Sequence, residues 1–204
     1  MEAATTSAER RLQGEKAQRI VEAMRSSVAR RGVAGSTFDH VAREAGVSRG
    51  LLHYYFGTKE RLLSEVVRHD CDVRMALLDA QLDGAATPDD VLERLVASLE
   101  QLVDAEPELI TLVFELFALS RRHDEIAAEF GELVRRMREQ LADILRAKHD
   151  DGAVRLGADA EQVADVLFAM ADGMALRMLA EPDRDWSATV TASVAAARPL
   201  LDAR

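Results

Sequence analysis

The sequence predicts an all-α protein in which a small N-terminal three-helix domain is joined to a larger helical domain. Three observations support this prediction. Apolar residues recur at spacings of three and four through most of the 204 residues. Ala, Leu, Val, Arg and Glu are frequent while aromatic residues make up only 4%, and no stretch alternates like a run of strands. The segment from Thr37 to Leu62 has the pattern of a helix, a tight turn and a second helix.

Caps and spacing define this helix-turn-helix. Thr37 is a good N-cap for a first helix whose apolar residues share one face. Gly46 suits the positive φ of a helix end, and Ser48 caps a second helix that runs to about Tyr55. The outward side of this second helix carries Arg49, Gly50, His53 and Tyr54. A short capped helix with hydrogen-bonding outward residues is typical of a recognition helix that enters DNA.

The rest of the chain divides around this segment. Residues 1–14 are polar and are expected to form a disordered arm, followed by a first helix from about Glu15 to Arg31. The predicted DNA-binding domain is therefore 15–57, and residues 58–204 form the larger domain. The helix that begins after Thr58 continues to about Leu82 and links the two.

Five further helices are expected in residues 58–204. Thr87 followed by Pro88 is a strong helix start, and Pro107 restarts the chain before an apolar helix. The remaining helices are expected at about 125–148, 159–180 and 187–201, the last of them rich in Ala.

Charge and composition limit the functional classes. The formal net charge is -10. Residues 1–60 hold ten Lys and Arg against seven Asp and Glu, which leaves -13 for the remainder. A cationic domain on an acidic one suits local DNA contact.

A single cysteine, Cys71, and the lack of a signal peptide or membrane-length apolar run indicate a cytoplasmic protein without membrane contact.

Sequence signatures of enzymes and cofactor sites are missing. The chain has no Ser-His-Asp signature, no Gly-rich phosphate loop and no zinc-site spacing. We therefore expect a protein that is not an enzyme, with no catalytic residue, metal or cofactor. Three His-Asp pairs are adjacent in sequence rather than spaced as ligands on a helix face.

The helix-turn-helix residues resemble one family closely. The pattern Thr37-x-x-x-Val41-Ala42-x-x-Ala45-Gly46-Val47-Ser48-x-Gly50-x-Leu52-x-Tyr54-Tyr55-Phe56-x-x-Lys59-x-x-Leu62 is similar to the head of TetR-family transcriptional regulators. The resemblance implies a homodimer formed through the last two helices, a small-molecule site in the larger domain, and double-stranded DNA as partner. It also implies DNA contacts at Thr37, Ser48, Arg49, Gly50, His53, Tyr54, Tyr55 and Lys59.

Two residues depart from the family pattern. Many members have Tyr where this chain has His53, and a small or polar residue where it has Leu51. His53 either donates to a phosphate or forms a weakly pH-dependent contact.

Candidate effector-binding residues are apolar and adaptable in shape. They are Phe114, Phe117, Met137, Met170 and Met174. The alternative interpretation of each is plain core. Glu115 interrupts an apolar run, and its carboxylate either receives a cationic ligand, pairs with an arginine such as Arg177, or lies at a solvent edge.

The expected dimer interface uses the last two helices, where Ala and Gly173 permit close approach. Its candidate residues are Val163, Val166, Leu167, Trp186, Val190 and Val194. We expect a ligand-responsive repressor that a small molecule releases from a palindromic operator. The alternatives are an activator or co-regulator with the same DNA-binding domain, and a helical small-molecule-binding protein whose N-terminal domain no longer binds DNA.

Overall fold

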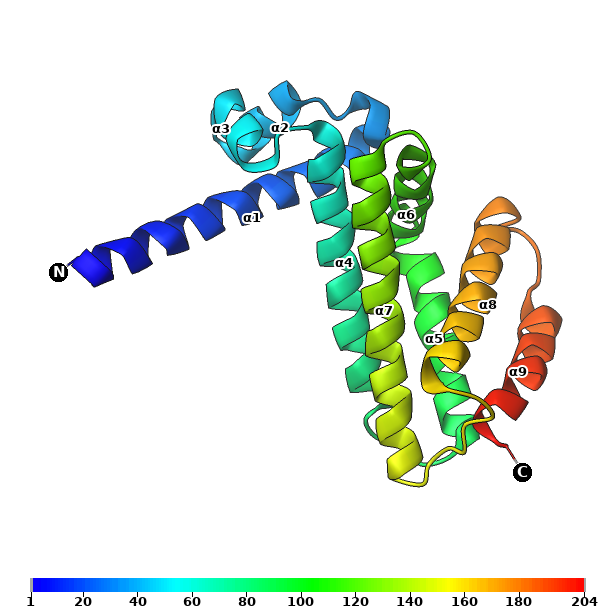
Figure 1. Ribbon diagram of the computed structural model, residues 1–204. Coiled ribbons are helices and arrows are strands. Elements are labelled where there is room, and N and C mark those ends of the chain that lie inside the picture. The colour runs from blue at the N-terminus through cyan, green and yellow to red at the C-terminus, as the bar shows by residue number, and fades with distance from the viewer. Residues whose placement is uncertain (1, 204) are drawn as a thin grey trace. The chain divides into compact units, whose positions relative to one another are not determined.

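The computed structural model describes residues 2–203, with side chains described from Gly14 onward (Figure 1). Over these residues the chain forms nine helices and no strand, apart from an isolated bridge between Arg155 and Asp202, which confirms the predicted all-α class. The helices are α1 (Glu2–Gly35), α2 (Phe38–Ala45), α3 (Arg49–Phe56), α4 (Lys59–Leu82), α5 (Pro88–Ala105), α6 (Pro107–Ser120), α7 (Asp124–Asp150), α8 (Ala160–Ala180) and α9 (Ser187–Leu201). No helix in the described range is long and apolar enough to span a membrane.

The chain divides into two compact units whose boundary differs from the predicted one. The head unit comprises residues 1–69 and 115–130, and the body unit comprises 70–114 and 131–204. The sequence-based bounds of 15–57 and 58–204 stay a prediction; by contacts, the first half of α4 and the α6–α7 corner group with the head unit. Within that unit Arg61 of α4 forms an ion pair of 3.3 Å with Glu129 of α7.

The head unit is built on a small apolar core. Ile20 and Met24 of α1, Val41 of α2, Leu52 of α3 and Leu62 of α4 are completely buried. Each comes from the apolar stripe of an amphipathic helix, so packing these stripes together fixes the helix-turn-helix against α1 and α4.

Helix α1 begins earlier than predicted. It starts at Glu2 and covers the range predicted as a disordered arm. Ala, Glu, Arg and Gln, which have high helix propensity, dominate this range. Gly32 has φ of +68°, which interrupts the helix near its predicted end. Beyond it, the hydroxyl of buried Ser36 donates to the Gly32 carbonyl at 2.9 Å and accepts from buried Ser27 at 3.0 Å.

The body unit encloses the larger core, to which α4, α5, α7, α8 and α9 contribute. Leu82, Val91, Leu145, Val163 and Leu201 are completely buried there. Helix α5 starts at the predicted Thr87, and the structure adds a capping box there. The Thr87 hydroxyl accepts from the Asp90 amide at 3.1 Å, and the Asp90 carboxylate accepts from the Thr87 amide at 3.0 Å.

Backbone hydrogen bonds fix the end of α9 to the segment before α8. The amide of Arg155 donates to the Leu201 carbonyl, and the amide of Gly157 donates to the Leu200 carbonyl, both at 2.9 Å. A Cβ at Gly157 would lie 2.8 Å from the Pro199 carbonyl oxygen, so this close approach requires glycine.

Candidate functional site

The head unit contains a capped helix-turn-helix. The Thr37 hydroxyl accepts from the His40 amide at 3.4 Å, and the Ser48 hydroxyl accepts from the Leu51 amide at 3.3 Å. Between the two helices Gly46 has φ of +66°, and its amide donates to carbonyls at the end of α2. These bonds satisfy helix ends locally, so a short segment folds with α3 in a defined orientation.

The outward side of α3 is exposed and polar. Ser48, Arg49, Gly50, His53 and Tyr54 are exposed, and Tyr54 has 76% of its surface accessible. No described side chain covers Tyr54 beyond its edge-to-face contact with Tyr55, at 5.4 Å between ring centroids. An exposed tyrosine and an exposed arginine on the same short helix offer hydrogen-bond donors to phosphates and base edges.

Arg49 is held by a weak pair. Its guanidinium lies 3.4 Å from the Asp39 carboxylate of α2, and both side chains are more than half exposed. An exposed pair of this kind contributes only about 0–1 kcal/mol. Arg49 can therefore leave Asp39 at little cost and reach another acceptor.

His53 is oriented by its own helix end. Its Nδ1 lies 3.0 Å from the Gly57 carbonyl, and its ring packs edge-on against Phe38 at 4.8 Å. A carbonyl only accepts, so Nδ1 donates this bond. The neutral ring then offers an acceptor at Nε2, while the protonated ring offers a donor. While the bond to Gly57 is kept, Nε2 is the ring nitrogen of His53 that is left for a further hydrogen bond.

The predicted contacts at the end of the helix-turn-helix lie at the start of α4. Lys59 is its first residue, and the Thr58 hydroxyl accepts from the Arg61 amide at 3.2 Å. Lys59 and Tyr55 are partly exposed. The eight predicted DNA contacts therefore fall in one segment, with Thr37 at the start of α2, six at α3 and Lys59 at α4.

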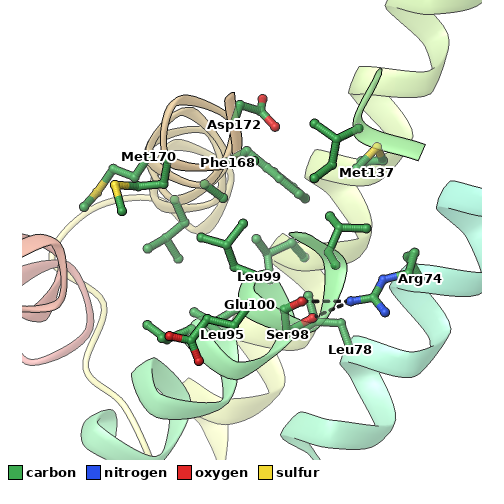
Figure 2. A pocket seen from close by; sticks show the side chains of 18 of the residues that line it. Arg74, Leu78, Leu95, Ser98, Leu99, Glu100, Met137, Phe168, Met170 and Asp172 are labelled. Carbon is green, nitrogen blue, oxygen red and sulfur yellow. Dashed lines mark hydrogen bonds between the residues drawn. The ribbon is translucent and has the colours of Figure 1, made fainter. Parts of the chain in front are cut away.

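The body unit contains a cavity of about 230 Å³. Its walls come from α4 to α9 and are almost wholly apolar. Figure 2 shows Phe168, Leu99 and Met137 pointing into this space from three helices. Cavities of this character bind small organic molecules.

Arg74 of α4 is the cation in the cavity wall. It is only 9% exposed and donates to the Ser98 carbonyl at 2.9 Å and to the Ser98 hydroxyl at 3.1 Å (Figure 2). It also pairs with Glu106 at 3.2 Å. These three partners compensate a guanidinium that would otherwise be costly to bury.

Two other polar groups of the wall have shifted pKa values. Burial raises the pKa of the Cys71 thiol to about 12, with smaller contributions from the negative charges of Asp72 and Asp172. Desolvation raises the pKa of the Asp172 carboxyl on α8, although the residue is exposed. Cys71 is therefore a poor nucleophile, and Asp172 is a carboxylate held beside apolar groups.

The structure distributes the predicted effector-binding residues over two places. Phe114, Met137, Met170 and Met174 line the cavity. Phe117 does not line it; it is 49% exposed and packs against Phe130 in the head unit. Glu115 is partly exposed and is not among the lining residues either. Arg74 and Asp172 were not predicted, although each is a charge within an apolar helical stripe, which is a detectable signal.

The predicted dimer residues also differ in position. Val163 is completely buried in the core of the body unit, and Leu167 is 9% exposed. Val190 and Val194 line the cavity. The Trp186 indole donates to the Glu181 carbonyl at 3.3 Å, with the Arg184 guanidinium over its ring. Val166 is 44% exposed, and Leu176, which was not predicted, is 51% exposed on the same helix.

Comparison with known proteins gives the family. The model for the tetR family of bacterial regulatory proteins matches residues 20–66, and the model for the C-terminal domain of BetI-type transcriptional repressors matches residues 88–202. The chain belongs to the TetR family of transcriptional regulators. Each match coincides with one candidate site, because the first contains the recognition helix and the second contains most of the cavity wall.

Individual TetR-family relatives agree with this assignment. The chain is 31% identical to the HTH-type transcriptional regulator BetI of Agrobacterium fabrum, over 69% of each chain. It is 29% identical to BetI of Rhizobium meliloti over 63% of each chain, so the match spans just under two thirds of that relative. The solved structure of Salmonella enterica GusR has the same fold, with a TM-score of 0.72 at 21% identity, covering 92% of this chain and 95% of GusR.

Proposed function

We propose that this TetR-family protein is a cytoplasmic, homodimeric repressor that a small molecule releases from a palindromic operator. The observation that carries the proposal is the path of α4. Its first residue, Lys59, comes three residues after Phe56, the last residue of the recognition helix, and its second half contributes Cys71, Arg74, Met75 and Leu78 to the cavity wall. One continuous helix therefore contains a candidate DNA contact and a cavity wall.

The effector acts through a difference in affinity. Free protein holds two recognition helices at a spacing that fits successive major grooves, about 34–36 Å. A molecule that binds the cavity more tightly when α4 is shifted favours a state in which this spacing is wrong. A 1:99 to 99:1 change in population requires roughly a 10⁴-fold difference in affinity between the two states.

DNA contact is tested with charge-removing variants. Lys59→Ala should weaken binding to all sequences and reduce the slope of log affinity against log salt by about 1, as expected for one lost phosphate contact. Arg49→Ala should relax preference at one base pair. Fluorescence anisotropy with genomic fragments selected by the protein measures both, and Arg184→Ala removes the same charge from the α8–α9 segment as a control. Parent-like binding by both variants would contradict the assignment.

The proposed dimer uses the outward side of α8. Val166, Gly173 and Leu176 are exposed there and lie at helical spacing, with open space around Gly173. Leu176→Glu places a charge in this apolar surface and should convert the dimer to a monomer, with specific operator affinity falling at least about 100-fold because one half-site is lost. Analytical ultracentrifugation checks the mass. A wild-type monomer at micromolar concentration would refute the dimer.

The cavity is tested by filling it. Leu99 of α5 lines the cavity and is partly buried, so Leu99→Trp should occupy the space and reduce effector binding while DNA binding persists. The measurement is the release of bound genomic DNA fragments when a candidate effector is added. Leu99→Trp should release less DNA than the parent protein.

A further inference from the structure

The charges around the cavity do not balance. Arg74 is neutralised by Glu106 and further bonded to Ser98. Asp172 and Glu100 also line the cavity, and no described residue forms an ion pair or hydrogen bond with either carboxylate. The charged residues that line the cavity therefore present more negative than positive charge to a bound ligand.

Asp172 is the better placed of these two carboxylates. It follows Phe168 by four residues on α8, so both side chains project from the same side of the helix. Its negative charge is the smallest of the three causes that raise the pKa of the Cys71 thiol on α4, after burial and the charge of Asp72. In Figure 2 Asp172 lies at one edge of the cavity and Arg74 at another, with apolar side chains between them. Asp172 and Glu100 are both exposed, so each carboxylate lies at the solvent edge of the cavity.

An anionic ligand fits this arrangement poorly. It would approach two carboxylates, and the guanidinium that might attract it already donates to Ser98 and faces Glu106 at 3.2 Å. A cation gains instead, because a carboxylate that lines the cavity and has no partner in the described part of the chain can form strong charge-assisted hydrogen bonds with it.

We propose that the effector is an apolar molecule that carries one cationic, hydrogen-bond-donating amine, and that this amine pairs with the Asp172 carboxylate. The apolar body of the molecule packs against Phe168, Leu99 and Met137. This inference rests on the proposed function, since it names the ligand class of the same cavity.

Three probes with one chain and different head groups test the proposal. Isothermal titration calorimetry with the full chain at neutral pH compares octylamine, octanol and octanoate. Octylamine should bind at least about tenfold more tightly than octanol, because it adds a charge-assisted hydrogen bond, and octanoate should bind most weakly.

Isosteric variants locate the charge effect. Asp172→Asn should lower octylamine affinity about tenfold and leave octanol affinity unchanged. Glu100→Gln removes the other cavity carboxylate and should keep the preference for the amine. Octanol or octanoate binding as tightly as octylamine, or an amine preference that survives in Asp172→Asn, would overturn the inference.

Leu99→Trp separates this inference from the proposed function. Equal binding of all three probes by the parent, abolished in Leu99→Trp, would leave the cavity as the effector site and refute only the role of Asp172. Binding that Leu99→Trp does not weaken, or binding of none of the probes, would refute the cavity as the effector site and the inference together.

Discussion

The recognition segment and the cavity are assembled differently. The predicted DNA contacts fall between Thr37 and Lys59, with most of them exposed, and neighbouring hydroxyls and glycines set their geometry. The cavity draws its lining from Cys71 to Ala197 and from six helices, with long-range apolar packing. The first site therefore depends on local structure placed on a small core, whereas the second exists only when the whole body unit is folded.

The largest effect should come from removing the support of the recognition helix. Leu52 of α3 is completely buried, so Leu52→Ala should destabilise the protein by about 2–5 kcal/mol. Operator affinity should fall, while octanol binding to the cavity should persist in protein that remains folded. Chemical denaturation and anisotropy measure the two effects.

The neighbouring leucine provides the control. Leu51 is only partly buried, and Leu51→Ala should cost markedly less. Equal losses for the two variants, or loss of cavity binding in Leu52→Ala before unfolding, would show that the two sites are not separable.

An intermediate effect is expected at the cavity wall. Arg74→Met leaves the Ser98 carbonyl and the Glu106 carboxylate without their shared donor and should cost about 1–3 kcal/mol. Arg136→Met breaks the ion pair of 2.9 Å between Arg136 of α7 and Asp72 of α4. This pair also joins α4 to another helix, but both of its side chains are about one-third exposed. This control should cost no more than about 1 kcal/mol. Thermal unfolding compares them, and a larger loss in the control would contradict the assignment.

The smallest effects should distinguish a carboxylate that supports structure from one that faces the cavity. Hydrogen bonds from the Ala86 amide and from Thr87 lower the pKa of Asp90 from 3.8. Its contribution to stability is therefore present above about pH 4 and is lost as the pH falls through the lower folded pKa. Asp90→Asn should lower Tm at neutral pH, with the difference disappearing in acid.

Asp172 should behave with the opposite sign. Desolvation raises its pKa above 3.8, so its charged form costs stability at neutral pH and this cost disappears as the pH falls. Asp172→Asn should therefore raise Tm slightly at neutral pH and leave it unchanged in acid. Calorimetry of Asp90→Asn and Asp172→Asn from neutral pH into acid measures both changes in Tm. A change in Tm of the same sign for both variants at neutral pH would contradict this assignment of the two carboxylates.

The same contrast explains what the sequence predicts. Caps and glycines act on their immediate neighbours, so Thr87 with Pro88 and Gly46 mark helix ends correctly. The bounds of α4 to α9 follow from such signals and from apolar periodicity. The recognition helix lies within a single motif, and its predicted range, Arg49 to about Tyr55, ends one residue before the observed helix. Its DNA contacts stay predictions.

Long-range packing is the part that the sequence did not reveal. Periodicity identifies an apolar residue without saying whether it lies in core, cavity or open surface, so Val163 and Val166 looked equivalent although only Val163 is buried. Arg74 and Asp172 belong to no motif. Arg74 matters because it has partners on another helix, whereas Asp172 matters because it has none among the described residues. The division of α4 between the two units likewise depends on which segments fold against it.

Cys71 gives this protein a built-in chemical reporter. It is the one cysteine of the sequence, it is 4% exposed, and it lies in the cavity wall. Raising its pKa from 9.0 to about 12 lowers the thiolate fraction on the order of a thousandfold at a given pH below 9. Its reaction with a soluble disulfide reagent should therefore be slow in the closed state and limited by opening of the wall. The rate at which Cys71 is labelled can be followed by mass spectrometry on the protein with its natural sequence. This rate would measure how often the cavity opens and how strongly a bound molecule suppresses that opening.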